Sequence, residues 1–141
     1  MSINSYASFG LLESRMFLQF TAVGVGAAFG AWLRWGFSSW LGPRSGSWPL
    51  GTIAANLIGG YLVGVAVAYF ALRPDLPPEW RLFAITGFLG GLTTFSTFSA
   101  EVTGLLARGD VIAGMGLAAV HLLGSLLLTA AGFATVRLLA A

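Results

Sequence analysis

The sequence predicts an all-α integral membrane protein with four transmembrane helices, the third of which is broken in the middle of the membrane. Hydrophobic residues make up 57% of the chain and charged residues only 9%, whereas about a quarter of a typical soluble domain is charged. Four spans of roughly 20 residues use most of the chain, which leaves room for one membrane domain, residues 1–141, and for no soluble one. The few arginines are dispersed, so no nucleic-acid partner is expected.

Charged and turn-forming residues divide the chain into four apolar segments. The predicted spans cover residues 16–34, 50–72, 82–107 and 111–136, and each is long enough to cross a bilayer. The stretch LGPRSGSWP is a turn-rich loop with aromatic residues suited to the level of the lipid headgroups. RPDLPPEWR, with three prolines and four charges, is a loop that cannot be helical inside a membrane, and RGD closes the third span with a tight turn. The first residues lack the basic start of a cleaved signal peptide and are interpreted as a short interfacial lead-in.

The arginines divide almost evenly between the two sides of the membrane. With four spans both termini lie on one side of the membrane. Four arginines lie on the side of the termini: Arg15, Arg73, Arg81 and Arg137. Three lie on the opposite side: Arg34, Arg44 and Arg108. An excess of positive charges on one side largely sets the orientation of a membrane protein. Because the arginines here are almost evenly divided, we predict insertion both ways up. Two inverted copies would then form an antiparallel homodimer. The alternative is that the one extra charge decides the orientation.

The segment GFLGGLTTFSTFSAE, residues 87–101, is the weakest part of the third span. Glycines and β-branched threonines disfavour a helix, so a break is expected between Gly90 and Thr94. Freed carbonyl oxygens at this depth must be covered or line a cavity, and they suit a small hard cation. Beyond the break Phe95 and Phe98 share a face, and their ring edges could contact an anion. Core packing is the alternative interpretation of these two rings.

Glycines spaced four residues apart place small residues on one face of each of the first three spans. Such faces allow membrane helices to approach closely, and tight packing is their expected role. The pairs are Gly26 with Gly30, Gly60 with Gly64, and Gly87 with Gly91.

Few polar side chains lie within the spans, where an unpaired polar group is expensive. Asn56 offers N–H donors to an anion path, although it could also clamp a neighbouring helix. His121 and Ser125 lie four residues apart on one face of the last span; with one histidine and no cysteine, a metal site is not expected there. Arg34 could reach the interface or act in function. Glu101, the one acid within a span, is interpreted as solvated near the interface.

Three motifs taken together resemble one family. GAAFGAWLRW, GTIAANLIGGYLVG and GFLGGLTTFSTFSAE, in this order, are similar to the small dual-topology fluoride channels of the Fluc or CrcB type. The resemblance covers roughly residues 26–125, and the third motif is highly specific. It implies a passive, fluoride-selective channel, not an enzyme, that exports cytoplasmic fluoride across the bacterial inner membrane. It also implies an antiparallel homodimer with two pores, each built from both subunits.

The resemblance implies roles for the residues of the second and third motifs. Phe95 and Phe98 would meet fluoride edge-on, and Asn56 would donate to it, with Thr94 beside them in the pore. The main-chain carbonyls of Gly90 and Thr93, from both subunits, would hold a structural sodium ion at the centre of the dimer.

Outside the third span the resemblance is less complete. Arg34 would lie near the aqueous vestibule, and Ser125 would end a polar track on the last span. In that track Leu117 and His121 stand where the family has a tyrosine and a serine. Protonation of His121 in the pore would make conduction depend on pH.

Two other classes of membrane protein fit the sequence less well. A small multidrug exporter is also a four-span antiparallel dimer, but it resembles proton exchangers with an acid in the first span, and residues 16–34 contain none. A structural subunit without transport would explain the glycine faces but not the segment of hydroxyls and phenylalanines. The chain has neither a phosphate-binding loop nor a series of acids across the spans, so transport is expected to be passive.

Overall fold

The computed structural model describes residues 3–42 and 48–141, and these residues form helices and loops without a strand. Arg44, one of the arginines counted above, lies outside the described residues, as does most of the first turn-rich loop. In chain order the helices are α1 (Ile3–Leu41), α2 (Leu50–Leu72), α3 (Pro78–Arg81), the π-helix η2 (Leu82–Leu89), α4 (Gly90–Leu92), α5 (Phe95–Ala107) and α6 (Val111–Leu139).

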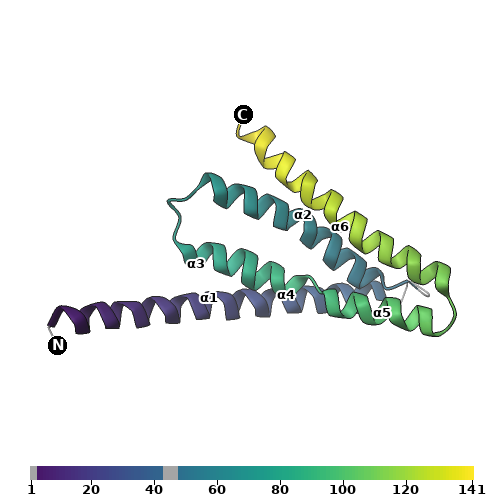
Figure 1. Cartoon of the computed structure of the whole chain (residues 1–141), viewed down its shortest axis with the longest axis horizontal. Helices are drawn as coiled ribbons and strands as arrows, with labels where there is room; N and C mark the ends of the chain where they lie inside the picture. Colours follow the sequence, from purple (N-terminus) through teal and green to yellow (C-terminus); the bar gives the residue numbers. More distant parts are fainter. Residues whose placement is uncertain (1–2, 43–47) are drawn as a thin grey trace.

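Four helical segments are long and apolar enough to cross a membrane, by their length and composition: Leu12–Leu41, Leu50–Leu72, Pro78–Ala107 and Val111–Leu139. The prediction of four helical spans is therefore confirmed. The first residues, interpreted as a short interfacial lead-in, are helical, because α1 continues as one long helix back to Ile3 (Figure 1). Its 39 residues extend about 58 Å at the rise of an α-helix, which is nearly twice the thickness of a hydrocarbon core.

The helices pack in two pairs, and glycines allow the close approach in both. α1 lies against the third span, where an added Cβ at Gly30 would collide with the Phe88 carbonyl oxygen. α2 lies beside α6 (Figure 1), where an added Cβ at Gly64 would collide with the Thr129 carbonyl oxygen. The other glycines predicted to form packing faces also meet the backbone or a side chain of a neighbouring helix: Gly26, Gly60, Gly87 and Gly91.

The third span is interrupted between α4 and α5, as predicted, but the interruption is narrower than expected. Thr93 (φ −82°, ψ 152°) and Thr94 (φ −149°, ψ 113°) are extended, whereas Gly90 remains helical (φ −65°, ψ −36°). Since α-helix restarts at Phe95, the two threonines and not the glycines form the break. The π-helix that precedes it was not predicted; π-helical turns are rare and often accompany functional sites.

Hydroxyl groups of the two threonines stabilise the broken ends. Thr93 Oγ1 donates to the Leu89 carbonyl oxygen at 2.8 Å. Thr94 is the N-cap of α5, and its Oγ1 accepts a hydrogen bond from the Thr97 N–H at 3.2 Å. A serine or threonine at this position satisfies an N–H that has no partner within the helix. The break is thus held by local side chains on both sides.

Candidate functional site

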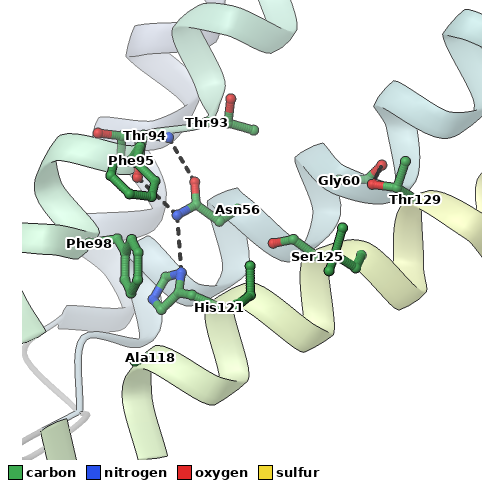
Figure 2. Close-up of a pocket in the computed structure, with 12 residues that line it drawn as sticks. Asn56, Gly60, Thr93, Thr94, Phe95, Phe98, Ala118, His121, Ser125 and Thr129 are labelled. Atoms are coloured by element: carbon green, nitrogen blue, oxygen red, sulfur yellow. Dashed lines mark hydrogen bonds between the residues drawn. The ribbon is translucent and has the colours of Figure 1, made fainter. Parts of the chain in front are cut away.

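A cavity of about 620 Å³ lies beside the break, between α2, α5 and α6 (Figure 2). It brings together the residues predicted for the pore, which come from three separate spans. The lining residues are Asn56, Gly60, Thr93, Thr94, Phe95, Phe98, Ala118, His121, Leu122, Ser125, Leu126 and Thr129. Most of this surface is apolar, so the few polar groups decide what it can hold.

Asn56 connects the break to the last span. Its Oδ1 accepts a hydrogen bond from the Thr94 N–H at 2.7 Å, and its Nδ2 donates to the Thr94 carbonyl oxygen at 3.0 Å. The same Nδ2 lies 3.1 Å from His121 Nδ1. In Figure 2 the amide stands at the centre of these three contacts. Asn56 therefore clamps a neighbouring segment, as the alternative interpretation held, and it does so at the wall of the cavity.

Two phenylalanines and the histidine form a row of rings that line the cavity (Figure 2). Phe95 and Phe98 meet edge to face, with centroids 5.4 Å apart and planes at 73°. Phe98 also lies against His121, at 4.6 Å and 32°. His121 is only 3% exposed, whereas Phe95 is 80% exposed. Phe95 is thus not packed in a closed core, because it projects from the surface of the single chain.

The polar side of α6 differs from the expected track. Ser125 and His121 line the cavity, but Leu117 does not and is 1% exposed. Thr129, which the sequence analysis missed, lines the cavity one turn beyond Ser125, and its Oγ1 donates to the Gly60 carbonyl oxygen at 2.9 Å. Because Thr129 lies four residues after Ser125, on the same face of the helix, the sequence could have indicated that it lines the cavity.

Arg34 reaches the break from α1. Its Nε donates to the Gly91 carbonyl oxygen at 3.1 Å. In an uninterrupted α-helix that oxygen would accept from the N–H of Phe95, but α5 starts at this residue. The guanidinium thus contacts a carbonyl at the broken end of α4, which a snorkelling side chain would not do.

Carbonyl oxygens are also freed at the other residues predicted to bind a cation. The Thr94 N–H, which would complete a helical hydrogen bond to Gly90, donates to Asn56 instead. Thr93 is extended, so its carbonyl no longer points along a helix axis. Carbonyl oxygens are suitable ligands for a small hard cation. The chemistry of Gly90 and Thr93 therefore fits such an ion.

Glu101 is not solvated as interpreted from its position. Its Oε1 accepts a hydrogen bond from Thr52 Oγ1 at 2.6 Å, and Thr52 is 5% exposed. Its Oε2 is buried without a hydrogen-bond partner in the part of the chain that the structure describes. Thr52 precedes Asn56 by one turn of α2, so this carboxyl group lies close to the cavity wall without lining it.

Four helices long and apolar enough to span a membrane, the third of them broken beside a cavity, define the class as a multi-pass membrane protein. A family model described as CrcB-like protein, Camphor Resistance (CrcB), matches residues 21–133. The chain belongs to this family, which confirms the resemblance drawn from its three motifs.

Curated bacterial proteins are similar to nearly the whole chain. The fluoride-specific ion channel FluC of Cupriavidus taiwanensis is 62% identical over 127 residues, which cover 87% of this chain and 98% of the relative. The protein of the same name from Cupriavidus metallidurans is 61% identical over 121 residues, covering 86% and 96%. That from Thiobacillus denitrificans is 58% identical over 120 residues, covering 85% and 97%. This chain is thus a multi-pass bacterial membrane protein.

Proposed function

We propose that the protein is a passive fluoride-selective channel that exports fluoride from the cytoplasm. The observation that carries the proposal is the convergence of an amide, an imidazole, hydroxyls and two aromatic rings on one cavity, in a chain 62% identical to a fluoride-specific ion channel. The relatives are named as ion channels, in agreement with the expectation that this chain is not an enzyme.

Selection of fluoride requires that a small, strongly hydrated anion exchange its water for donors of the pore. Asn56 and Thr94 form one wall of the cavity, but both N–H groups of Asn56 are engaged, one by the Thr94 carbonyl oxygen and one by His121. The donors left for an ion are therefore those of His121 and Ser125 on α6. The ring edges of the phenylalanines carry partial positive charge and would contact the ion between these donors. The short reach of such contacts favours fluoride over the larger chloride ion.

We propose further that two copies assemble as an antiparallel homodimer in the bilayer, with two pores. Phe95 is 80% exposed on the single chain while lining the cavity, so a second copy could complete this open side. The nearly even division of the arginines supports insertion both ways up. Arg34 would then lie near the aqueous vestibule of a pore.

The proposed dimer would hold a structural sodium ion at its centre. The carbonyl groups of Gly90 and Thr93 from both copies would be the ligands, since both lie at the broken end of the third span. When bound, the ion would supply positive charge and link the two breaks. Exchange of sodium for a larger cation during purification should lower dimer stability; unchanged stability would contradict this site.

Flux from liposomes tests the channel. Purified protein should release fluoride in an electrogenic, fluoride-selective leak that needs no proton gradient. Phe95→Ile and Phe98→Ile should each reduce this flux while the dimer stays folded. Normal flux in both variants would mean that the rings only pack, and drug–proton exchange or no flux by the unmodified protein would refute the channel.

A further inference from the structure

The orientation of the Asn56 amide is determined by the backbone of Thr94. The Thr94 N–H can only donate, and it lies 2.7 Å from Oδ1; the Thr94 carbonyl oxygen can only accept, and it lies 3.0 Å from Nδ2. Exchanging the oxygen and nitrogen of the amide would set donor against donor and acceptor against acceptor. The atom that faces His121 is therefore the NH₂ group of Asn56 (Figure 2).

This orientation determines the protonation of the imidazole. Nδ2 of Asn56 has only hydrogens to offer, so His121 Nδ1, at 3.1 Å, must be the acceptor. A neutral imidazole that accepts at one ring nitrogen carries its proton on the other. His121 is accordingly the Nε2–H tautomer.

The Nε2–H group needs an acceptor that the single chain does not contain. Nε2 is buried and has no hydrogen-bond partner among the described residues, and a buried N–H without a partner destabilises the fold. The Phe98 ring lies over the imidazole at a tilt of 32°, so its face does not lie in the ring plane along which this N–H points. His121 lines the cavity, and an anion that enters beside the imidazole would supply the acceptor.

Other ionisable groups do not hydrogen-bond to the imidazole. α2 carries no acidic or basic residue. The charged groups of the surrounding elements are Glu101 on α5, bonded to Thr52; Arg34 on α1, bonded to Gly91; Glu13 and Arg15 in the N-terminal part of α1; and Asp110 and Arg137 at the two ends of α6. Glu101 is bonded to Thr52, which lies one turn of α2 before Asn56. Its carboxyl group is therefore the alternative origin of a pH effect on the cavity.

We propose that Asn56 holds His121 as the Nε2–H tautomer, which presents one N–H donor to the anion, and that uptake of a second proton in acid breaks this arrangement and lowers anion flux. The proposal rests on the proposed fluoride channel. The imidazolium has an N–H on both nitrogens, and Nδ1–H would then face the Asn56 NH₂. Either the amide turns, which breaks both hydrogen bonds to Thr94, or the ring leaves its place. Its charge would also hold an anion more tightly, whereas conduction requires release.

The tautomer can be measured independently of conduction. His121 is the one histidine of the sequence, so ¹⁵N-histidine labelling of protein without a polyhistidine tag gives the signals of a single ring. At neutral pH we expect an unprotonated Nδ1 and a protonated Nε2. Asn56→Asp would turn a carboxylate oxygen toward the ring and move the proton to Nδ1. The Nδ1–H tautomer in the unmodified protein would overturn the proposal.

Conductance in planar bilayers tests the effect on flux, because neutral HF carries no current. The unmodified protein should lose about tenfold in fluoride conductance as the pH falls from neutral through the range in which the imidazole takes up its second proton, the factor that one hydrogen bond of ordinary strength gives. His121→Gln keeps an acceptor and a donor but does not titrate, so it should conduct with a flat pH profile. His121→Leu has no donor and should conduct poorly at every pH.

A matched variant separates the two ionisable groups near the cavity. Glu101→Gln should keep the pH dependence of the unmodified protein. If instead His121→Gln keeps the dependence, or Glu101→Gln abolishes it, the proposal is wrong. An Nε2–H tautomer in a protein that carries no fluoride current at any pH would contradict the proposed channel, and with it the effect on flux, but not the role of Asn56 in positioning the ring.

Discussion

Substitution of Gly30 by alanine tests whether close packing of α1 positions the broken third span. A Cβ at this position would lie 2.7 Å from the Leu92 backbone nitrogen and 3.0 Å from the Gly91 carbonyl carbon. Comfortable contacts are about 3.5 Å or longer, so the helices would have to separate by at least roughly 0.8 Å to clear the Leu92 nitrogen, and by more to clear the Phe88 carbonyl oxygen, which lies closer still. The same shift would lengthen the hydrogen bond from Arg34 Nε to the Gly91 carbonyl oxygen.

The expected loss of stability follows from two opposing contributions. Overpacking costs about 1–3 kcal/mol, and the upper part of this range applies because Gly30 meets backbone atoms, which cannot rotate away. The better helix propensity of alanine offsets about 1 kcal/mol. The free energy of unfolding should therefore fall by about 2 kcal/mol, and fluoride flux should fall with it.

Unfolding of the purified protein in mixed detergent micelles, followed by tryptophan fluorescence, measures this difference. Gly24→Ala on the same helix is the matched control, because a Cβ there would meet no atom within 4 Å. This control should be as stable as the unmodified protein or slightly more so. If Gly30→Ala and Gly24→Ala unfold alike, close packing at Gly30 does not hold the third span.

Two further predictions concern carboxyl groups. Thr52→Val should lower the free energy of unfolding by about 1–3 kcal/mol, because it removes the hydrogen bond to Glu101 Oε1 and leaves a buried carboxyl group without a partner. Thr52→Ser keeps the hydroxyl and should be as stable as the unmodified protein. Equal stability of the two variants would show that the hydroxyl of Thr52 does not stabilise Glu101. In the loop after α2, the hydrogen bond from Arg73 lowers the pKa of Asp75. The stabilisation by this pair is present at neutral pH and is lost as the pH falls through that lowered pKa. Asp75→Asn should therefore be only slightly less stable than the unmodified protein at neutral pH, since both groups are exposed, and equally stable in strong acid. Thermal unfolding at a series of pH values would measure this difference in stability. A difference that grows in acid would contradict the predicted direction of the pH dependence.

The sequence predicted the four helical spans and the weak point of the third because both depend on local composition. Long uncharged runs bounded by arginines, prolines and turn residues determine where helices can lie in a membrane. The same reasoning located the break within a few residues but attributed it in part to Gly90. In the structure Gly90 is helical. Glycine is acceptable both in a helix and in a break, so its presence alone does not locate the break, and only tertiary contacts decide between the two.

Those contacts join residues far apart in the chain. Asn56 is 38 residues from Thr94 and 65 from His121, and no local pattern reports that the three meet. Two hydrogen bonds between Asn56 and the Thr94 backbone, one accepted and one donated by the amide, replace the helical ones, which explains why the chain leaves the helix at the threonines. The partner of Glu101, 49 residues away, was unpredictable for the same reason, and the carboxyl group was wrongly interpreted as solvated.

By itself the sequence determined which polar groups the protein places inside the membrane, because every such group is a visible exception in an apolar run. Only the tertiary structure decided which nitrogen of His121 carries the proton and which backbone groups Asn56 satisfies. The physical reason is that the direction of a hydrogen bond depends on which atoms face each other across helices, and this is determined by packing.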